Sequence, residues 1–411
     1  MLRPWLRPAL FAVLLSVDAS AAASVRWNGA EYDMREPTLI PDKVCNVRDF
    51  GARGDGTTSD TAAITGAIAA CAGGGHIVLP APGAYVSGTL TLTSNQELCV
   101  RRGAVLLGSA ARDDYPLLPA FPSYGRARDV TWAVSRVRHA ALVRAVDAAN
   151  VSVRCGGEIH GRGAEFWWPA FDRRELAGSR PRLLSFERCD GVELERLTLR
   201  DSPFWTVHLI YSRRVRARLL TILAPADRGN TDGIVVDSSA DVEIEHCHIA
   251  TGDDGVVIKS GMDGAGRAVG APSSAIVVRD VTTRGVGGFA IGSEMSGGVE
   301  NVSFDKVTLL GLRGFHIKFC RGRGGYVRDI SWANIPELRR STGQYPLFRM
   351  SGRYDGCNAS GPYPRVGGFH FRNCPPLLRH QVVRACAVVG DHWAQDAHPD
   401  AVPAGLLACP S

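Results

Sequence analysis

Apolar residues in the middle of the chain fall into short segments in which alternate positions are hydrophobic. Five of these segments share one pattern and begin at Val192, Val215, Val242, Ile276 and Val302. Their starts are 23, 27, 34 and 26 residues apart, and a glycine-rich insertion at 261–273 accounts for the longest interval. Such spacing is typical of a stacked β-coil, in which each coil adds short strands to parallel sheets. We therefore predict an all-β parallel β-helix; a leucine-rich repeat is the competing solenoid, but its motif is not sustained.

The ends of a solenoid expose unpaired strand edges and need a cover. Residues 59–75 read SDTAAITGAIAACAGGG, which predicts a short N-terminal capping helix. Ser59 or Asp60 would cap its start, and the glycines would end it. Its buried face would carry Ile64, Ala67, Ile68 and Cys71. Because no linker interrupts the pattern, we expect residues 24–411 to form a single β-helix domain.

The first residues have the features of a secretory signal peptide. A basic region with Arg3 and Arg7 precedes the apolar run at 9–17, and small residues follow up to Ala23. The run is too short to span a bilayer, which takes about 20 residues. We therefore assign residues 1–23 to the signal peptide and expect a secreted protein, extracellular or in the cell wall, with no membrane partner.

Export would make the eleven cysteines disulfide partners rather than metal ligands. No C-x-x-C pair is present, which argues against zinc. We expect a bridge between Cys45 and Cys71 and local bridges among Cys357, Cys374, Cys386 and Cys409. The formal net charge of +6 suits an anionic partner, but scattered arginines on an exported protein argue against nucleic acid.

Two similar phrases carry the candidate chemistry. NTDGIVV contains Asp232, and TGDDGVVIK contains Asp253 and Asp254. When their apolar tails are aligned, Asp232 falls on Asp254, 22 residues later, which is one coil of the repeat. Adjacent parallel strands lie about 4.8 Å apart, so the three carboxyl groups should share one small patch. A single Asp-Gly pair would indicate only a turn.

Three neighbouring carboxyl groups raise one another's pKa, which is costly without a bound metal or a proton-transfer role. Calcium binding is one explanation. Glycoside hydrolysis is the other, because it needs one carboxyl group to protonate the leaving oxygen and another to activate water or attack.

The motifs NTDG, GDDGVVIK, GSEMSGGV and IKFCRGRGGYVRDI, in this order, resemble those of the polygalacturonases, family 28 of the glycoside hydrolases. NVRDFGARGDGTTSDTAAITGAIAACAGGG resembles the N-terminal segment of that family, and SPFWTVH and FAIGSEMSGG resemble its plant-type branch. The likeness covers about residues 45 to 340.

The resemblance implies a right-handed parallel β-helix that hydrolyses α-1,4-galacturonosidic bonds with inversion. Asp253 would be the general acid, while Asp232 and Asp254 would hold and activate the water. Neither a metal nor a cofactor is expected. The partner would be an acidic pectic polysaccharide, and the protein would be a monomer.

The chain departs from the family pattern at two places. The family's G-H-G, whose histidine supports the acid, reads Gly285-Val286-Gly287, and its R-I-K reads His316-Ile317-Lys318. Histidine lacks the permanent charge and the bidentate geometry of arginine.

The expected substrate-binding residues are Lys318, His316, Asn230 and Lys259. Lys318 would bind a galacturonate carboxylate, while His316 is expected to point away from it. Asn230 would orient the aspartate coil through its side-chain amide, and Lys259 would contact substrate or neutralise the acids. Three alternatives are a rhamnogalacturonan hydrolase, a calcium-dependent pectate lyase with an arginine base, and a non-catalytic pectin-binding protein.

Overall fold

The computed structural model describes residues 24–27, 30–33, 43–125, 137–336, 347–354 and 361–385. The chain forms two compact units, Met1–Thr38 and Leu39–Ser411. In the first unit, β1 (Ser24–Trp27) pairs antiparallel with β2 (Ala30–Asp33). The predicted signal peptide, residues 1–23, lies outside the described residues. Within the described ranges, no helix has the length and apolar character needed to cross a membrane.

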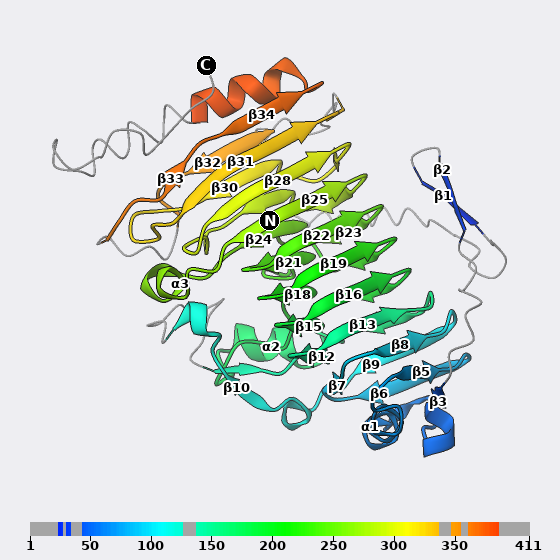
Figure 1. Ribbon diagram of the computed structural model, residues 1–411. Coiled ribbons are helices and arrows are strands. Elements are labelled where there is room, and N and C mark those ends of the chain that lie inside the picture. The colour runs from blue at the N-terminus through cyan, green and yellow to red at the C-terminus, as the bar shows by residue number, and fades with distance from the viewer. Residues whose placement is uncertain are drawn as a thin grey trace, which may run out of the picture. The chain divides into compact units, whose positions relative to one another are not determined.

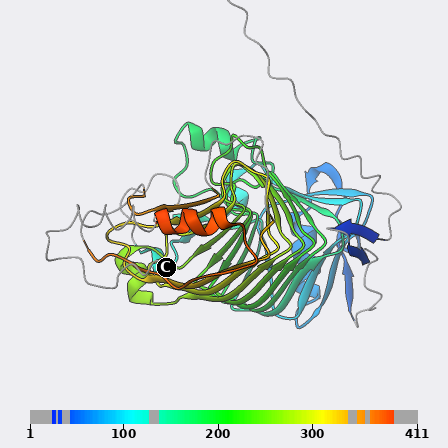
Figure 2. The same ribbon diagram turned by 90° about the horizontal axis from the view of Figure 1, so that it is seen from above.

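The second unit is a right-handed parallel β-helix, as predicted (Figure 1). Each coil gives one strand to each of three parallel sheets, so strands adjacent in a sheet come from successive coils. Figure 2 shows the coils from above, lying over one another. Most inward-facing side chains are aliphatic or aromatic and form one continuous core.

The strands of the three sheets follow in chain order. Sheet 1 consists of β7 (Leu90–Leu92), β12 (Val143–Val146), β15 (Leu184–Glu187), β18 (Val207–Ile210), β21 (Ile234–Asp237), β24 (Val256–Lys259), β27 (Phe289–Ile291), β30 (Phe315–Lys318) and β32 (Phe348–Ser351). Sheet 2 consists of β3 (Val44–Asn46), β5 (Gly75–Leu79), β8 (Gln96–Val100), β13 (Ala149–Arg154), β16 (Asp190–Glu195), β19 (Arg213–Arg218), β22 (Ala240–Glu245), β25 (Ser273–Arg279), β28 (Val299–Asp305), β31 (Tyr326–Ala333), β33 (Arg365–Val366) and β34 (Phe369–Arg372). Sheet 3 consists of β4 (Asp55–Ser59), β6 (Gly83–Ser87), β9 (Ala104–Gly108), β14 (Glu158–His160), β17 (Thr198–Arg200), β20 (Thr221–Leu223), β23 (His248–Thr251), β26 (Thr282–Gly285) and β29 (Thr308–Leu309).

The register of sheet 2 is the register of the sequence repeat. The first residues of the five repeated segments pair in series along the sheet, from Val192 through Val215, Val242 and Ile276 to Val302. All five side chains are buried in the core. The insertion at 261–273 leaves the coil and contains α3 (Asp263–Val269). It therefore lengthens one repeat without shifting the register.

The predicted capping helix is α1 (Thr61–Ala70), which buries Ile64, Ala67 and Ile68. Asp60 occupies its N-cap position but does not cap it with its side chain. The carboxylate instead accepts hydrogen bonds from the main-chain N–H groups of Arg53 and Gly54, at 2.7 and 3.1 Å. The remaining helical segments are η1 (Val47–Phe50), η2 (Arg112–Asp114), η3 (Pro122–Tyr124), α2 (Trp167–Asp172) and residues 376–385. A short antiparallel pair, β10 (Leu117–Pro119) with β11 (Val137–His139), completes the elements.

One cysteine prediction is confirmed and another is wrong. Cys45 and Cys71 form a disulfide that ties β3 to the end of α1. Cys374 is not in a disulfide. Its thiol lies against main-chain oxygens, 3.2 Å from Trp332 O and 3.4 Å from Arg372 O. The other three cysteines of that prediction, at 357, 386 and 409, lie outside the described residues.

Candidate active site

The three candidate carboxyl groups lie just before two neighbouring strands of sheet 1. β21 and β24 pair in parallel with Ile234 opposite Val256, and Gly233 N donates to Asp254 O at 2.9 Å. This register, continued two residues toward the start of each strand, places Asp232 opposite Asp254 one coil away. The alignment of the two sequence phrases is therefore the register of the strands.

The surroundings of Asp232 disfavour the charged form of its carboxyl group. Its side chain is buried, and in the described part of the chain its Oδ1 has no hydrogen-bond partner. Burial, followed by the charges of Asp253 and Asp254, raises the pKa of Asp232 well above its usual range. Lys259 and Lys318 offset only part of this effect. Asp232 therefore tends to hold a proton in the free chain.

Asp254 has the opposite surroundings, because it forms a buried ion pair with Lys318. The Lys318 ammonium donates to Asp254 Oδ2, and the two side chains are only 5% and 4% exposed. Burial by itself would lower the pKa of Lys318, but the charge of Asp254, with smaller effects from other anions, raises it above its ordinary value. Lys318 therefore stays charged beside Asp254.

Asp253 is the most exposed of the three carboxyl groups, with 23% of its side chain accessible. Its Oδ2 accepts a hydrogen bond from Asn230 N at 3.0 Å, and its Oδ1 accepts one from Asp254 N at 3.0 Å. Asn230 contacts this carboxyl group through its main-chain N–H, whereas its side-chain amide, which was expected to orient the aspartate coil, accepts a hydrogen bond from Arg180. An oxygen held in this way at the surface is accessible to an incoming glycosidic bond.

Lys259 lies on the same face of sheet 1 as Lys318, two coils earlier, but has a different partner. Its ammonium donates to Glu294 Oε2 at 2.5 Å and lies 5.1 Å from the centre of the Trp205 ring. Burial would raise the pKa of Glu294, but Lys259 and then Arg323 lower it to about 2. Lys259 is buried and paired, so its ammonium neutralises this carboxylate inside the protein.

The expectation that His316 points away from Lys318 is wrong. Ile317 between them packs into the core, and residues two apart in a strand share a face. His316 Nε2 lies 2.8 Å from Ser351 Oγ. Burial, with smaller effects from the charges of Lys318, Arg349 and Arg313, lowers the pKa of His316 to about 2. The histidine is therefore neutral at ordinary pH and adds no positive charge to the site.

Comparison with known proteins identifies the family of the chain. Residues 130–348 match the glycosyl hydrolases family 28, and residues 44–101 match a segment described as rhamnogalacturonase A/epimerase, pectate lyase-like. A probable polygalacturonase of Vitis vinifera is 36% identical over 339 residues, which cover 79% of this chain and 67% of the relative. The chain belongs to glycosyl hydrolase family 28.

Other members of family 28 resemble the chain more distantly. The polygalacturonase of Persea americana is 27% identical over 79% of this chain and 65% of its own length. The crystal structure of a hyperthermoactive exopolygalacturonase from Thermotoga maritima superposes with a TM-score of 0.68 at 30% identity, covering 82% of each chain. The chain thus spans about two thirds of the length of the two plant relatives.

Sequence reasoning missed two arginines of this family 28 site. Arg180 is buried, and its Nη2 donates to Gly229 O and Asn230 Oδ1, each at 3.2 Å. Arg313 Nη1 lies 3.6 Å from Asp253 Oδ1. The strand register would have located Arg313, because the line through Asp232 and Asp254 reaches it two coils later. No sequence pattern indicated Arg180, which lies in the segment between α2 and β15.

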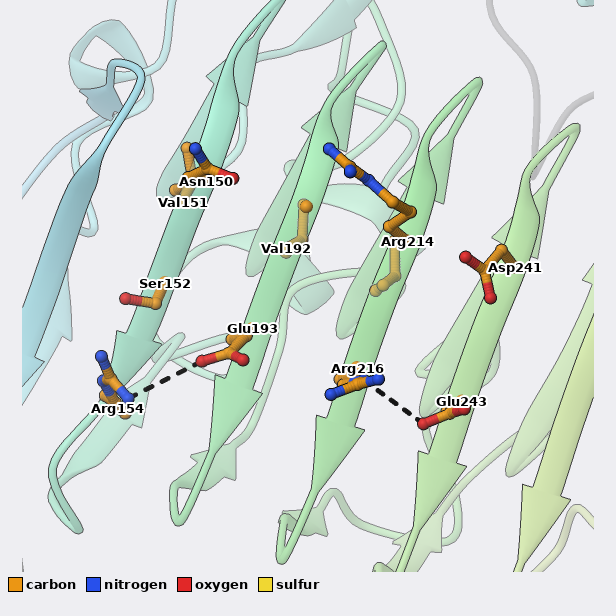
Figure 3. Close-up of a pocket in the computed structure, with 12 residues that line it drawn as sticks. Asn150, Val151, Ser152, Arg154, Val192, Glu193, Arg214, Arg216, Asp241 and Glu243 are labelled. Atoms are coloured by element: carbon orange, nitrogen blue, oxygen red, sulfur yellow. Dashed lines mark ion pairs between the residues drawn. The ribbon is translucent and has the colours of Figure 1, made fainter. Parts of the chain in front are cut away.

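A pocket and a group of side chains with the spacing of metal ligands lie elsewhere on the β-helix. A shallow pocket of about 440 Å³ lies on sheet 2, where Arg154 pairs with Glu193 at 3.7 Å and Arg216 pairs with Glu243 at 3.4 Å (Figure 3). These two ion pairs neutralise much of the charge of the side chains that line the pocket.

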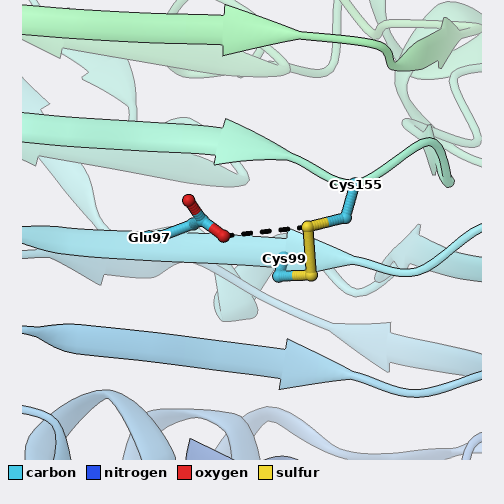
Figure 4. A group of neighbouring side chains, drawn as sticks. All are labelled: Glu97, Cys99 and Cys155. Atoms are coloured by element: carbon cyan, nitrogen blue, oxygen red, sulfur yellow. Dashed lines mark hydrogen bonds between the residues drawn. A yellow bond between two sulfur atoms is a disulfide. The ribbon is translucent and has the colours of Figure 1, made fainter. Parts of the chain in front are cut away.

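Glu97, Cys99 and Cys155 meet the spacing of metal ligands. Cys99 and Cys155 form a disulfide, and the Cys155 sulfur lies 3.7 Å from Glu97 Oε1 (Figure 4). Disulfide sulfurs are not the thiolates that bind zinc, so this group does not suit a metal while the bridge is intact.

Proposed function

We propose that this chain hydrolyses α-1,4-galacturonosidic bonds of pectin with inversion at the anomeric carbon. The observation that carries the proposal is the meeting of three carboxyl groups with unlike surroundings on adjacent coils. Asp232 is buried where a proton is favoured, Asp254 is paired with a lysine, and Asp253 is oriented at the surface. Carboxyl groups in different protonation states are what glycoside hydrolysis requires.

In the proposed mechanism Asp253 protonates the leaving oxygen, and Asp254 with Asp232 activates the attacking water. Lys318 holds the carboxyl group of Asp254 in place through their ion pair. The proton that Asp232 holds in the free chain belongs to a coupled group of carboxyls, and such groups redistribute protons when a ligand changes their surroundings. Inverting enzymes separate acid and base by about 6.5 to 9.5 Å to admit the water.

Lys318 and His316 are proposed to meet the substrate from the same face of sheet 1. The Lys318 ammonium has three N–H donors and uses one on Asp254, which leaves capacity for a galacturonate carboxylate. Neutral His316 would offer a hydrogen bond and no charge. Asn230 acts through Asp253, and Lys259 acts as a buried countercharge, so both would position the site without touching the sugar.

The proposed partner is an acidic pectic polysaccharide, bound by a monomer. Plant relatives named as polygalacturonases support this substrate class. We also propose that residues 1–23 direct export, so that the protein meets pectin outside the cell.

The test is the release of reducing ends from polygalacturonate by the wild type and by Asp253→Asn. We expect release by the wild type and a loss of 10²-fold or more in the variant, the usual scale for a general acid. Equal release by both proteins would refute catalysis by this site. An unsaturated, ultraviolet-absorbing product would identify a lyase, and binding without cleavage would identify a pectin-binding protein.

A further inference from the structure

Arg313 stands on the same line of residues as the candidate carboxyl groups. The pairing of Ile234 with Val256, of Val256 with Phe289 and of Phe289 with Phe315 fixes the register of four consecutive coils. Two residues earlier on each coil, this register aligns Asp232, Asp254, Gly287 and Arg313. The hydrogen bond from Arg313 N to Val286 O, at 3.0 Å, agrees with it.

Gly287 lies between Arg313 and the aspartate coil in this register, and it packs closely against that coil. A Cβ atom at Gly287 would lie 1.9 Å from Asp253 O, so the backbone of the aspartate coil occupies that space. Only glycine fits at this position, so the two coils pack main chain against main chain here. From the following coil, Arg313 Nη1 lies 3.6 Å from Asp253 Oδ1.

The guanidinium of Arg313 is open to a ligand. Its side chain is 40% exposed. In the part of the chain that the structure describes, the guanidinium donates no hydrogen bond. Its ion pair there is with Asp253. A guanidinium carries five N–H donors in a fork that fits a carboxylate bidentately.

Three other cations lie near the carboxyl groups, and each is buried. Lys318 donates to Asp254, Lys259 donates to Glu294, and Arg180 donates to main-chain and side-chain oxygens of the coil that carries Asp232. These groups balance charge inside the protein, and His316 is uncharged. A polyanionic substrate that approaches Asp253 from solvent therefore meets Arg313 as an exposed positive group.

We propose that Arg313 binds a carboxylate of the sugar chain beside Asp253 and thereby determines specificity for an anionic substrate. The proposal rests on the proposed function for the identity of the substrate. The substrate carboxylate would use the donors of Arg313 that Asp253 leaves open, so one guanidinium would hold both the acid and the sugar unit next to the cleaved bond.

The test measures binding of a galacturonic acid trimer by calorimetry in an Asp232→Asn background, which keeps the Asp253–Arg313 pair while blocking turnover. We expect Arg313→Ala to weaken binding roughly tenfold or more, the scale of a charge-assisted hydrogen bond. Arg313→Lys should retain part of the affinity. Arg216→Ala, which removes an exposed arginine from sheet 2, should bind like the parent protein.

The fully methyl-esterified trimer separates charge recognition from a structural role. Removal of Arg313 should leave its affinity unchanged, because the ester has no carboxylate to bind. An equal loss on acid and ester, an unchanged affinity of Arg313→Ala for the acid, or no binding by the parent would overturn the proposal. Hydrolysis of polygalacturonate by the wild type is measured separately. An inactive wild type with Arg313-dependent binding would count against the proposed function alone.

Discussion

Lys318 of β30 donates to Asp254, which precedes β24 two coils earlier in the β-helix. This buried pair joins the stability of sheet 1 to the charge state of the candidate base. Removal of one partner would leave the other as an isolated buried ion, which proteins tolerate poorly.

Lys318→Met should therefore destabilise the fold by ~3–5 kcal/mol. Urea unfolding followed by circular dichroism measures the change. The double variant Lys318→Met/Asp254→Asn contains neither charge and should recover much of the loss. If the single and double variants unfold alike, the ion pair does not carry the effect.

Asp232→Asn should make the folded chain more stable at neutral pH while abolishing activity. Because burial raises the pKa of Asp232 in the folded chain, the folded state binds its proton more tightly than the unfolded state does. Its contribution to stability is complete below the unfolded pKa and is lost as pH rises through the folded pKa. The asparagine variant has no such loss.

Urea unfolding at a series of pH values measures this slope. The wild type should lose stability with rising pH in the window above the ordinary aspartate pKa, and Asp232→Asn should show a flatter profile. Asp241→Asn, an exposed aspartate of β22, is the matched control and should behave like the wild type. If Asp232→Asn shows the same pH dependence of stability as the wild type, the proton is not bound by Asp232.

The Cys45–Cys71 bridge should stabilise the capped end of the solenoid. It closes a loop with a sequence separation of 26 residues, for which chain entropy predicts about 3 kcal/mol. The double variant Cys45→Ala/Cys71→Ala should lower the unfolding free energy by about this amount. Cys374→Ala, which breaks no disulfide, should cost clearly less. Equal losses would show that packing, and not the bridge, accounts for the effect.

The strand register and the core followed from the sequence because a β-helix repeats its local pattern. The alternation that begins at Val192 and Val215 requires inward residues to stack, and the same stacking brings Asp232 to Asp254. The position of α1 followed from its apolar spacing and from the glycines after it.

Side-chain partners did not follow, because they depend on how far each side chain reaches from its coil. The carboxylate of Asp60 turns back to the preceding loop, and Lys259 reaches Glu294 rather than the aspartates. Arg313 lies two coils beyond Asp254, and its long side chain reaches the carboxylate of Asp253. The orientation of His316 was predictable from strand alternation and was mispredicted.

Asp253 and Asp232 have separable roles under the proposed mechanism. An aryl galacturonide has a leaving group that needs little protonation, so loss of the general acid should harm its cleavage much less than that of polygalacturonate. We therefore expect Asp253→Asn to recover a large part of wild-type kcat on the aryl substrate, while Asp232→Asn stays impaired on both. The opposite pattern would exchange the two roles.

Proton NMR of the first product formed from a galacturonate oligomer tests the central claim most directly. Attack by a water held by Asp232 and Asp254, on the face opposite Asp253, inverts the α-linkage. The account predicts that the new reducing end appears first as the β-anomer and then mutarotates. Initial release of the α-anomer would contradict it.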